Sequence, residues 1–227
     1  MQVYKIGVPE IAISPLTSKL KGALNIGPTL WLIPGGSNIP LAVAVMSSLS
    51  PDLTSNLTVA LTDERMGPYN HPDSNWAQLR LAGFNPQKAR IIEVLKENDQ
   101  SDLKAITERY NTEIDTALDE ANTAIGQFGM GVDGRIAGIL PNSVATNEAS
   151  YSAVVGYTVP PFNLITISFS AIRRLHSAFL IAMGEPKYSQ IVNLINEDLA
   201  LNVQPAQIIK QVSEAYLYND QMAGKQA

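Results

Sequence analysis

The sequence contains no cysteine, and only two of its 227 residues are histidine. Without cysteine the chain forms no disulfide bond, thiolate metal site or iron–sulfur cluster, and it has no cysteine nucleophile. Two histidines are too few for a histidine-rich metal site.

Basic residues are also scarce, since 16 lysines and arginines stand against 21 aspartates and glutamates, for a net charge of −5. Nonspecific binding to nucleic acid needs a basic surface that displaces counterions, so we expect no nucleic-acid partner. No run approaches the roughly 18 apolar residues of a membrane span. The first residues, MQVYKIGVPEIAIS, lack the features of a signal peptide. We therefore expect a soluble, cytoplasmic protein with no membrane partner.

The chain shows no internal repeat, no low-complexity tract and no linker rich in proline, glycine or serine. Hydrophobic residues make up 45% of it and charged residues 16%, which is ordinary for a chain that folds around a core. A chain of this length buries roughly 70% of its unfolded surface. We predict a single domain over residues 1–227.

Short apolar runs alternate along the chain with segments of helical periodicity. The predicted strands are TLWLI (29–33), LTVAL (57–61), AIGQF (124–128), LITISF (164–169) and AFLIAM (178–183). Helices are predicted over residues 39–49, 101–122, 186–195 and 205–216, with Ser101 as a cap, and a short segment with the cap candidate Ser170 separates the last two strands. This alternation predicts a mostly parallel α/β sheet with helices on both faces.

In open sheets of this kind, ligands bind beyond the carboxyl ends of the strands. The loops at Gly35, Asp63, Gly131 and Gly184 each follow a predicted strand. We therefore expect these four loops to converge on one crevice.

Two of the loops carry features that favour an anion. Pro34-Gly35-Gly36-Ser37-Asn38 follows a strand and opens a helix, so it presents backbone N–H groups and a helix dipole to an anion. It lacks the Walker and dinucleotide-binding fingerprints. The segment is equally compatible with a tight turn. Lys187 is predicted in the first turn of a helix, where the dipole disfavours a lysine unless an anion is bound. The alternative is an exposed, solvated lysine.

The other two loops carry acids and arginines. Thr62-Asp63-Glu64-Arg65 is either an acid/base group with an anion clamp or a surface ion pair. The glycine-rich turn of residues 129–135 holds Asp133 and Arg135, and its alternative is a plain connection. Of the two histidines, His71 is a loop candidate, whereas His176 lies among apolar residues and is expected to be structural.

Taken together and in chain order, these loops resemble the 6-phosphogluconolactonase and glucosamine-6-phosphate deaminase family. The matching stretches are PGGSNIPLA (34–42), TDERMGPYNHPDSNWAQLR (62–80), GMGVDGRIAGILP (129–141), VPPFNLITIS (159–168) and GEPKYSQI (184–191). The resemblance implies a three-layer αβα sandwich with a Rossmann-like sheet, and catalysis without a metal or cofactor. The expected partner is a small sugar phosphate, bound by a monomer or a homodimer.

The lactonase branch is the nearer one. Deaminases typically have Asp-Glu-Tyr where this chain has Asp63-Glu64-Arg65, and Phe-Asn-Glu-Pro where it has Gly-Ile-Leu-Pro (138–141). Their catalytic glutamate falls at Leu140, which cannot transfer protons. The resemblance therefore implies hydrolysis of 6-phospho-D-glucono-1,5-lactone in the pentose phosphate pathway.

The resemblance also implies roles for individual residues. Asp63 faces the sugar ring, Arg65 clamps the phosphate or the carboxylate product, and Asp133 orients the residue after Gly134. The phosphate-binding group comprises Gly35, Gly36, Ser37, Asn38, which replaces the usual threonine, and Lys187.

Arg135 departs from the pattern, because lactonases have at this position a histidine assigned as the base that activates water. An arginine stays protonated and cannot accept that proton. Three accounts are open. The chain is a lactonase whose base is Asp63, Glu64 or His71 while Arg135 stabilises the oxyanion; or it binds a sugar phosphate without turnover; or it is a related enzyme, such as an isomerase or deaminase, of different specificity.

Overall fold

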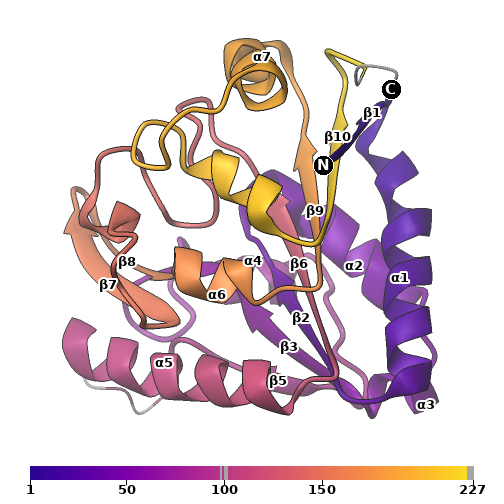
Figure 1. The fold of residues 1–227 in the computed structure, drawn as a ribbon. Helices are drawn as coiled ribbons and strands as arrows, with labels where there is room; N and C mark the ends of the chain where they lie inside the picture. The colour runs from indigo at the N-terminus through magenta and orange to yellow at the C-terminus, as the bar shows by residue number, and fades with distance from the viewer. Residues whose placement is uncertain (98, 100–101, 224–227) are drawn as a thin grey trace.

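The computed structural model describes residues 1–97, 99 and 102–223 and is built on a seven-stranded parallel sheet (Figure 1). The strand order across it is β1 (Gln2–Lys5), β10 (Glu214–Asn219), β9 (Ser177–Ala182), β6 (Thr123–Gly129), β2 (Thr29–Ile33), β3 (Leu57–Leu61) and β5 (Arg90–Ile92), and every neighbouring pair is parallel. β2 and β9 are buried along their whole length. Their apolar composition reflects this burial, because a central parallel strand is covered on both faces.

Helices flank the sheet, as the alternation of elements predicted. α1 (Ile13–Ile26) and α2 (Ile39–Ser47) lie on one side of it, and α5 (Leu103–Glu120) and α6 (Phe169–Arg173) lie on the other (Figure 1). The remaining elements are short: α3 (Pro51–Thr54), α4 (Asn75–Leu81), α7 (Tyr188–Asn196), and the 3₁₀ turns η1 (Pro9–Ala12), η2 (Gly36–Asn38), η3 (Val144–Thr146), η4 (Glu185–Lys187) and η5 (Pro205–Gln211). The prediction of a mostly parallel sheet between helical layers is confirmed.

A second, antiparallel sheet of three strands stands beside the first. It contains β4 (Asp63–Arg65), β8 (Phe162–Ile167) and β7 (Val154–Val159), in that order. The predicted strand over residues 164–169 is therefore displaced by two residues and belongs to this smaller sheet. It ends before Phe169 because Ser168, rather than the predicted Ser170, caps α6 by accepting a hydrogen bond from the Ala171 N–H at 3.3 Å.

The predicted helix over residues 205–216 is wrong in its second half. Residues 205–211 form the turn η5, and the chain then enters β10, which pairs with β1 and β9. Tyr216 and Tyr218 lie in this strand and contact the Phe179 ring of β9. Aromatic residues fit a pleated, half-buried surface, and this cross-strand packing prevails over the helical spacing.

The long predicted helix is confirmed with shorter limits. α5 begins at Leu103, and its cap is Asp102, whose carboxylate accepts a hydrogen bond from the Lys104 N–H at 2.9 Å. The predicted cap, Ser101, lies outside the described residues. The helix predicted over residues 186–195 begins as η4 and continues as α7.

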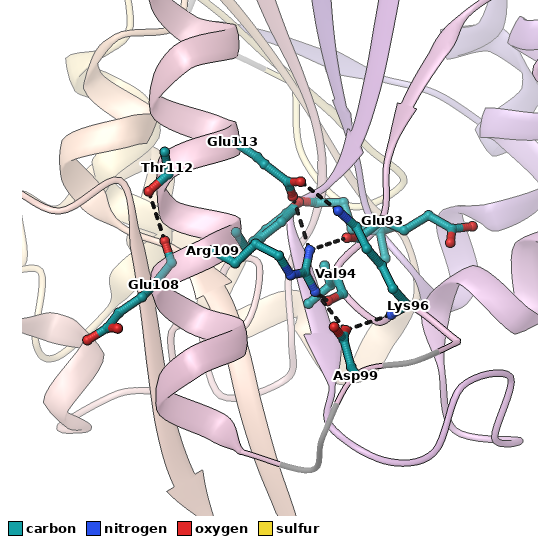
Figure 2. Close-up of polar contacts among 10 residues, drawn as sticks. Glu93, Val94, Lys96, Asp99, Glu108, Arg109, Thr112 and Glu113 are labelled. Atoms are coloured by element: carbon teal, nitrogen blue, oxygen red, sulfur yellow. Dashed lines mark hydrogen bonds and ion pairs between the residues drawn. The ribbon is translucent and has the colours of Figure 1, made fainter.

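Arg109 ties α5 to the segment that follows β5 (Figure 2). One guanidinium nitrogen donates to the Glu93 carbonyl at 3.2 Å and to Glu113 at 3.1 Å, and another donates to the Val94 carbonyl at 2.6 Å and to Asp99 at 2.7 Å. A single side chain thus satisfies two carbonyls and two carboxylates. A lysine at this position has no planar fork with which to make the same set of bonds.

We predict that Arg109→Ala lowers the free energy of unfolding by about 2 kcal/mol, because the Glu93 and Val94 carbonyls lose the donor that Arg109 provides. Arg90→Ala is the control, since Arg90 makes one exposed contact of 3.4 Å with Glu120, and its expected effect is below about 0.5 kcal/mol. Urea unfolding of both variants measures the difference. Equal losses contradict the role assigned to Arg109.

Candidate active site

A cavity of about 520 Å³ opens at the carboxyl ends of the parallel strands, where the loops after β2, β3, β6 and β9 meet the hairpin between β7 and β8. Eight of the ten predicted site residues line it: Gly35, Gly36, Ser37, Asn38, Asp63, Arg65, Arg135 and Lys187. Asp133 and His71 do not. The expected convergence of the four loops is therefore observed, whereas the roles of these residues stay predictions.

The glycine-rich loop leads into the N-terminus of α2 through η2. The buried Asn38 side chain donates to the Ile181 carbonyl at 3.4 Å, and the Asn38 carbonyl accepts from the Gln127 amide at 3.2 Å. Asn38 thus fastens the loop to β6 and β9. Gly35 allows a close approach from α4, because a Cβ at this position would overlap the side-chain oxygen of Asn75.

Asp63 is partly buried on the cavity wall. One carboxylate oxygen accepts from the Thr62 hydroxyl at 2.9 Å, and the other accepts from the Asn75 amide at 3.4 Å. Burial raises the pKa of Asp63 above its usual 3.8, while these two donors and the charges of Arg65 and Arg135 oppose the rise. A carboxylate with a raised pKa is a better proton acceptor near neutral pH.

Glu64 points away from the cavity and is fully buried. Its carboxylate accepts the backbone N–H groups of Arg65, Asn75 and Trp76 and the Ser74 hydroxyl, at 2.7 to 3.2 Å. Burial raises the pKa of Glu64, and these four hydrogen bonds oppose the rise. Glu64 therefore anchors the N-terminus of α4 to β4 and offers no free lone pair to a ligand.

His71 also lies outside the cavity. Its Nε2 contacts the Arg65 carbonyl at 2.8 Å, and its ring packs against Gly67. These contacts hold the loop after β4 in shape. Arg65 itself reaches the cavity wall, and its guanidinium donates to the Asp73 carbonyl at 3.1 Å.

The turn of residues 131–135 presents Arg135 to the cavity. The Gly131 N–H donates to the Arg135 carbonyl at 3.0 Å, and a side chain at Gly131 would overlap both Asp133 and Arg135. Asp133 accepts the Arg135 N–H at 3.2 Å, and its second oxygen lies 3.8 Å from the guanidinium. Asp133 thus fixes the turn, and Arg135 keeps about half of its side chain exposed (49%).

Lys187 ends η4 directly before α7, and it is half-buried, so the alternative of an exposed, solvated lysine is wrong. Burial and the charge of Arg135 lower the pKa of Lys187, while Asp220 raises it. Sequence analysis missed Asp220, which follows β10 and accepts the Gly184 N–H at 3.1 Å. It was missed because residues 205–216 were assigned to a helix, so no strand end was expected there.

Three further residues that sequence analysis missed support the site from the small sheet and α4. The Thr166 hydroxyl accepts the Gly138 N–H at 3.0 Å, and the Tyr157 hydroxyl donates to the Gly138 carbonyl at 2.6 Å. Asn75, the first residue of α4, lines the cavity beside Asp63. Asn75 and Thr166 lie in the matching stretches 62–80 and 159–168, which identified no role for either residue, and Tyr157 lies in none of these stretches.

Within the described part of the chain, no group of three or more histidine or acidic side chains is arranged to hold a metal ion. The helices found in that part are all too short or too polar to cross a membrane.

Comparisons with known proteins show which family the sequence matches. The sequence model of the family described as "Glucosamine-6-phosphate isomerases/6-phosphogluconolactonase" matches residues 15–218. A curated 6-phosphogluconolactonase from Thermotoga maritima is 20% identical over 191 residues, covering 84% of this chain and 86% of that protein. One from Streptomyces coelicolor is 28% identical over 199 residues, covering 80% and 76%.

Two solved structures show the same fold. A 6-phosphogluconolactonase from Shewanella baltica has a TM-score of 0.81 at 19% identity, over 96% of this chain and 97% of that one. A monomeric glucosamine-6-phosphate deaminase has a TM-score of 0.77 at 18% identity, over 96% and 97%. The expected sandwich architecture is therefore confirmed.

The raised pKa of Asp63 predicts how Asp63→Asn changes stability with pH. Because the folded state holds the proton more tightly, the contribution of Asp63 to stability is present below about pH 3.8 and is lost as the pH rises through the folded pKa. Asp63→Asn removes this loss. The melting temperature of the variant relative to the parent is therefore expected to be higher at pH 7 than at pH 4.

Asp198→Asn is the control for this measurement, because the exposed Asp198 has its pKa lowered by Lys210. Its contribution to stability is present at neutral pH and is lost as the pH falls. A small effect of the opposite sign is expected. A melting-temperature difference between Asp63→Asn and the parent that does not change with pH contradicts a raised pKa of Asp63.

Proposed function

The chain belongs to the glucosamine-6-phosphate isomerase/6-phosphogluconolactonase family, and from this premise we propose that it hydrolyses 6-phospho-D-glucono-1,5-lactone to 6-phosphogluconate, the lactone-opening step of the pentose phosphate pathway. In this proposal Asp63 is the general base and Arg135 stabilises the oxyanion. The observation that carries it is a cavity wall that holds one partly buried carboxylate among three cationic side chains.

The binding of an anion is supported by charge. Arg65, Arg135 and Lys187 line one cavity, and burial, together with a smaller contribution from the charge of Arg135, lowers the pKa of Lys187. A bound phosphate opposes this lowering, because an anion favours the charged form of a nearby lysine. The Gly36–Asn38 turn at the start of α2 adds backbone N–H groups and the positive end of a helix dipole.

Asp63 is the best supported of the three candidate bases, all of which lie in the described part of the chain. Glu64 has its carboxylate occupied by four donors, and His71 lies off the cavity against a carbonyl. Asp63 lines the cavity, and burial raises its pKa, which makes it a better proton acceptor than an ordinary aspartate.

The reaction then follows in two steps. Asp63 takes a proton from a water molecule while the water oxygen attacks the lactone carbonyl carbon, and Arg135 stabilises the negative charge that develops on the carbonyl oxygen. Collapse of the tetrahedral intermediate breaks the bond between that carbon and the ring oxygen. Asp63 gives the proton to the ring oxygen, which leaves as a hydroxyl. The product carboxylic acid releases its remaining proton to solvent, and the resulting carboxylate faces Arg135.

Binding without turnover is the second candidate, and Arg135 is the residue that favours it. A guanidinium cannot deprotonate water but is a good bidentate ligand for a carboxylate. The cavity then retains the open-chain acid. Deamination is disfavoured, because Leu140 lines the cavity where the family resemblance implies a catalytic glutamate in deaminases.

The proposal predicts the rate of lactone hydrolysis in variants, measured on freshly generated substrate and corrected for spontaneous opening. Asp63→Asn is expected to lower kcat by about 100-fold or more, because it removes the base. Arg135→Ala is expected to lower it by about 100-fold or more through loss of oxyanion stabilisation, with Arg135→Lys less affected. Asp52→Asn, at an exposed position outside the cavity, is the control. A parent protein no faster than buffer removes the lactonase proposal.

Binding of 6-phosphogluconate tests the anion site separately. We expect Lys187→Ala to raise the dissociation constant about tenfold or more, since it removes a charged donor from the cavity. The exposed Lys88 pairs with Asp52, so Lys88→Ala is the matched control. Isothermal titration calorimetry measures both, and equal affinities for the two variants contradict the role of Lys187.

A further inference from the structure

Asn75 lies on the cavity wall between Asp63 and Gly35. Its amide nitrogen donates to the Asp63 carbonyl at 2.8 Å and faces the Asp63 carboxylate at 3.4 Å. Its amide oxygen lies against Gly35, where a Cβ would overlap it. One side chain thus contacts both the candidate base, Asp63, and the glycine-rich loop of residues 35–38, which we call the anion loop.

The neighbouring backbone fixes the position of this side chain. The Asn75 N–H donates to Glu64 at 2.7 Å, and Glu64 also accepts from Ser74 and Trp76 on either side. Asn75 is 1% exposed and is the first residue of α4. Its amide therefore has little freedom to turn away from Asp63.

The amide oxygen of Asn75 is buried and has no hydrogen-bond partner among the described residues. An unsatisfied buried acceptor destabilises a fold, so a purely structural position is better filled by an apolar side chain. The contacts of the amide nitrogen with Asp63 therefore explain the presence of an asparagine at this position.

We propose that Asn75 is a positioning residue, whose amide fixes the orientation of the Asp63 carboxylate relative to the anion loop. The proposal rests on the proposed function, in which Asp63 acts on water. The Thr62 hydroxyl holds one carboxylate oxygen and Asn75 holds the other, so the remaining lone pairs are directed by two fixed donors.

Removal of one of these donors changes the titration of Asp63, because donors favour the charged form of a carboxylate. The other titratable or charged groups that act on Asp63, or on which it acts, come from four elements and stay in place: Arg65 of β4, Arg135 of the turn after β6, Tyr110 of α5 and Tyr157 of β7. A shift caused by a variant of Asn75 therefore reports the missing amide.

The test is a ¹³C NMR titration of the aspartate carboxyl groups, with the Asp63 signal assigned from Asp63→Asn. In Asn75→Ala the Asp63 midpoint is expected to move to higher pH, because a donor to the charged form is lost. In the hydrolysis assay kcat is expected to fall about tenfold or more, with KM changed less than kcat, because the base loses its orientation while the anion site is kept. Asn75→Leu, close in shape but without a donor, serves where the alanine variant does not fold.

Ser74→Ala is the matched control. It removes the hydroxyl that bonds Glu64 and caps α4, so it loosens the helix without removing the Asn75 amide. An unchanged Asp63 midpoint in Ser74→Ala, together with a shift in the Asn75 variants, supports the proposal. Equal shifts in both, or none in the Asn75 variants, overturn it.

The proposed function fails on a different result. Full activity in Asp63→Asn excludes Asp63 as the base, whatever the titration of Asp63 shows. The titration needs no turnover, so it tests the contact of Asn75 with Asp63 even in a protein that only binds its ligand.

Discussion

The parallel pairing of the seven-stranded sheet is the constraint on which the site depends. Parallel strands end at the same edge of a sheet, so the loops after β2, β3, β6 and β9 lie together at that edge. The small sheet joins this edge at Thr62, whose N–H donates to the Ile33 carbonyl of β2 and whose carbonyl accepts the Ile167 N–H, both at 2.9 Å. Thr62 thus makes a backbone hydrogen bond to a strand of each sheet, and the next residue is Asp63.

The central strands could be predicted because they are buried on both faces and therefore appear as continuous apolar runs, as in residues 29–33 and 57–61. Three other strands of this sheet could not be predicted. β1 is mostly exposed, β5 has three residues, and β10 is recognisable only from the partners that flank it. The same limit applies to the site: glycines and charges at strand ends identify loops, but a contact such as that of Tyr157 with Gly138 forms only when separate segments fold together.

Charge is distributed unevenly between the molecule and its cavity. The whole chain has a net charge of −5, yet the cavity wall carries Arg65, Arg135 and Lys187 against Asp63. Like charges in a partly buried space cost free energy, because burial weakens the solvation that screens them. Two acids lie next to two of these cations. Asp133 accepts the backbone N–H of Arg135, and Asp220 lies close to Lys187. They reduce the cost without occupying the cavity, which leaves room for an anion.

The two adjacent carboxylates show how a strand divides roles. Successive side chains of a strand point to opposite sides, so Asp63 and Arg65 share the cavity face of β4 while Glu64 faces α4. When residues 62–65 are taken as a loop, Asp63 and Glu64 are equal candidates for the base. Once they form a strand, the period of two separates them: Glu64 receives four donors and becomes part of the fold, whereas Asp63 receives two side-chain donors and keeps lone pairs for a ligand. Environment rather than residue type therefore distinguishes the anchoring acid from the candidate base.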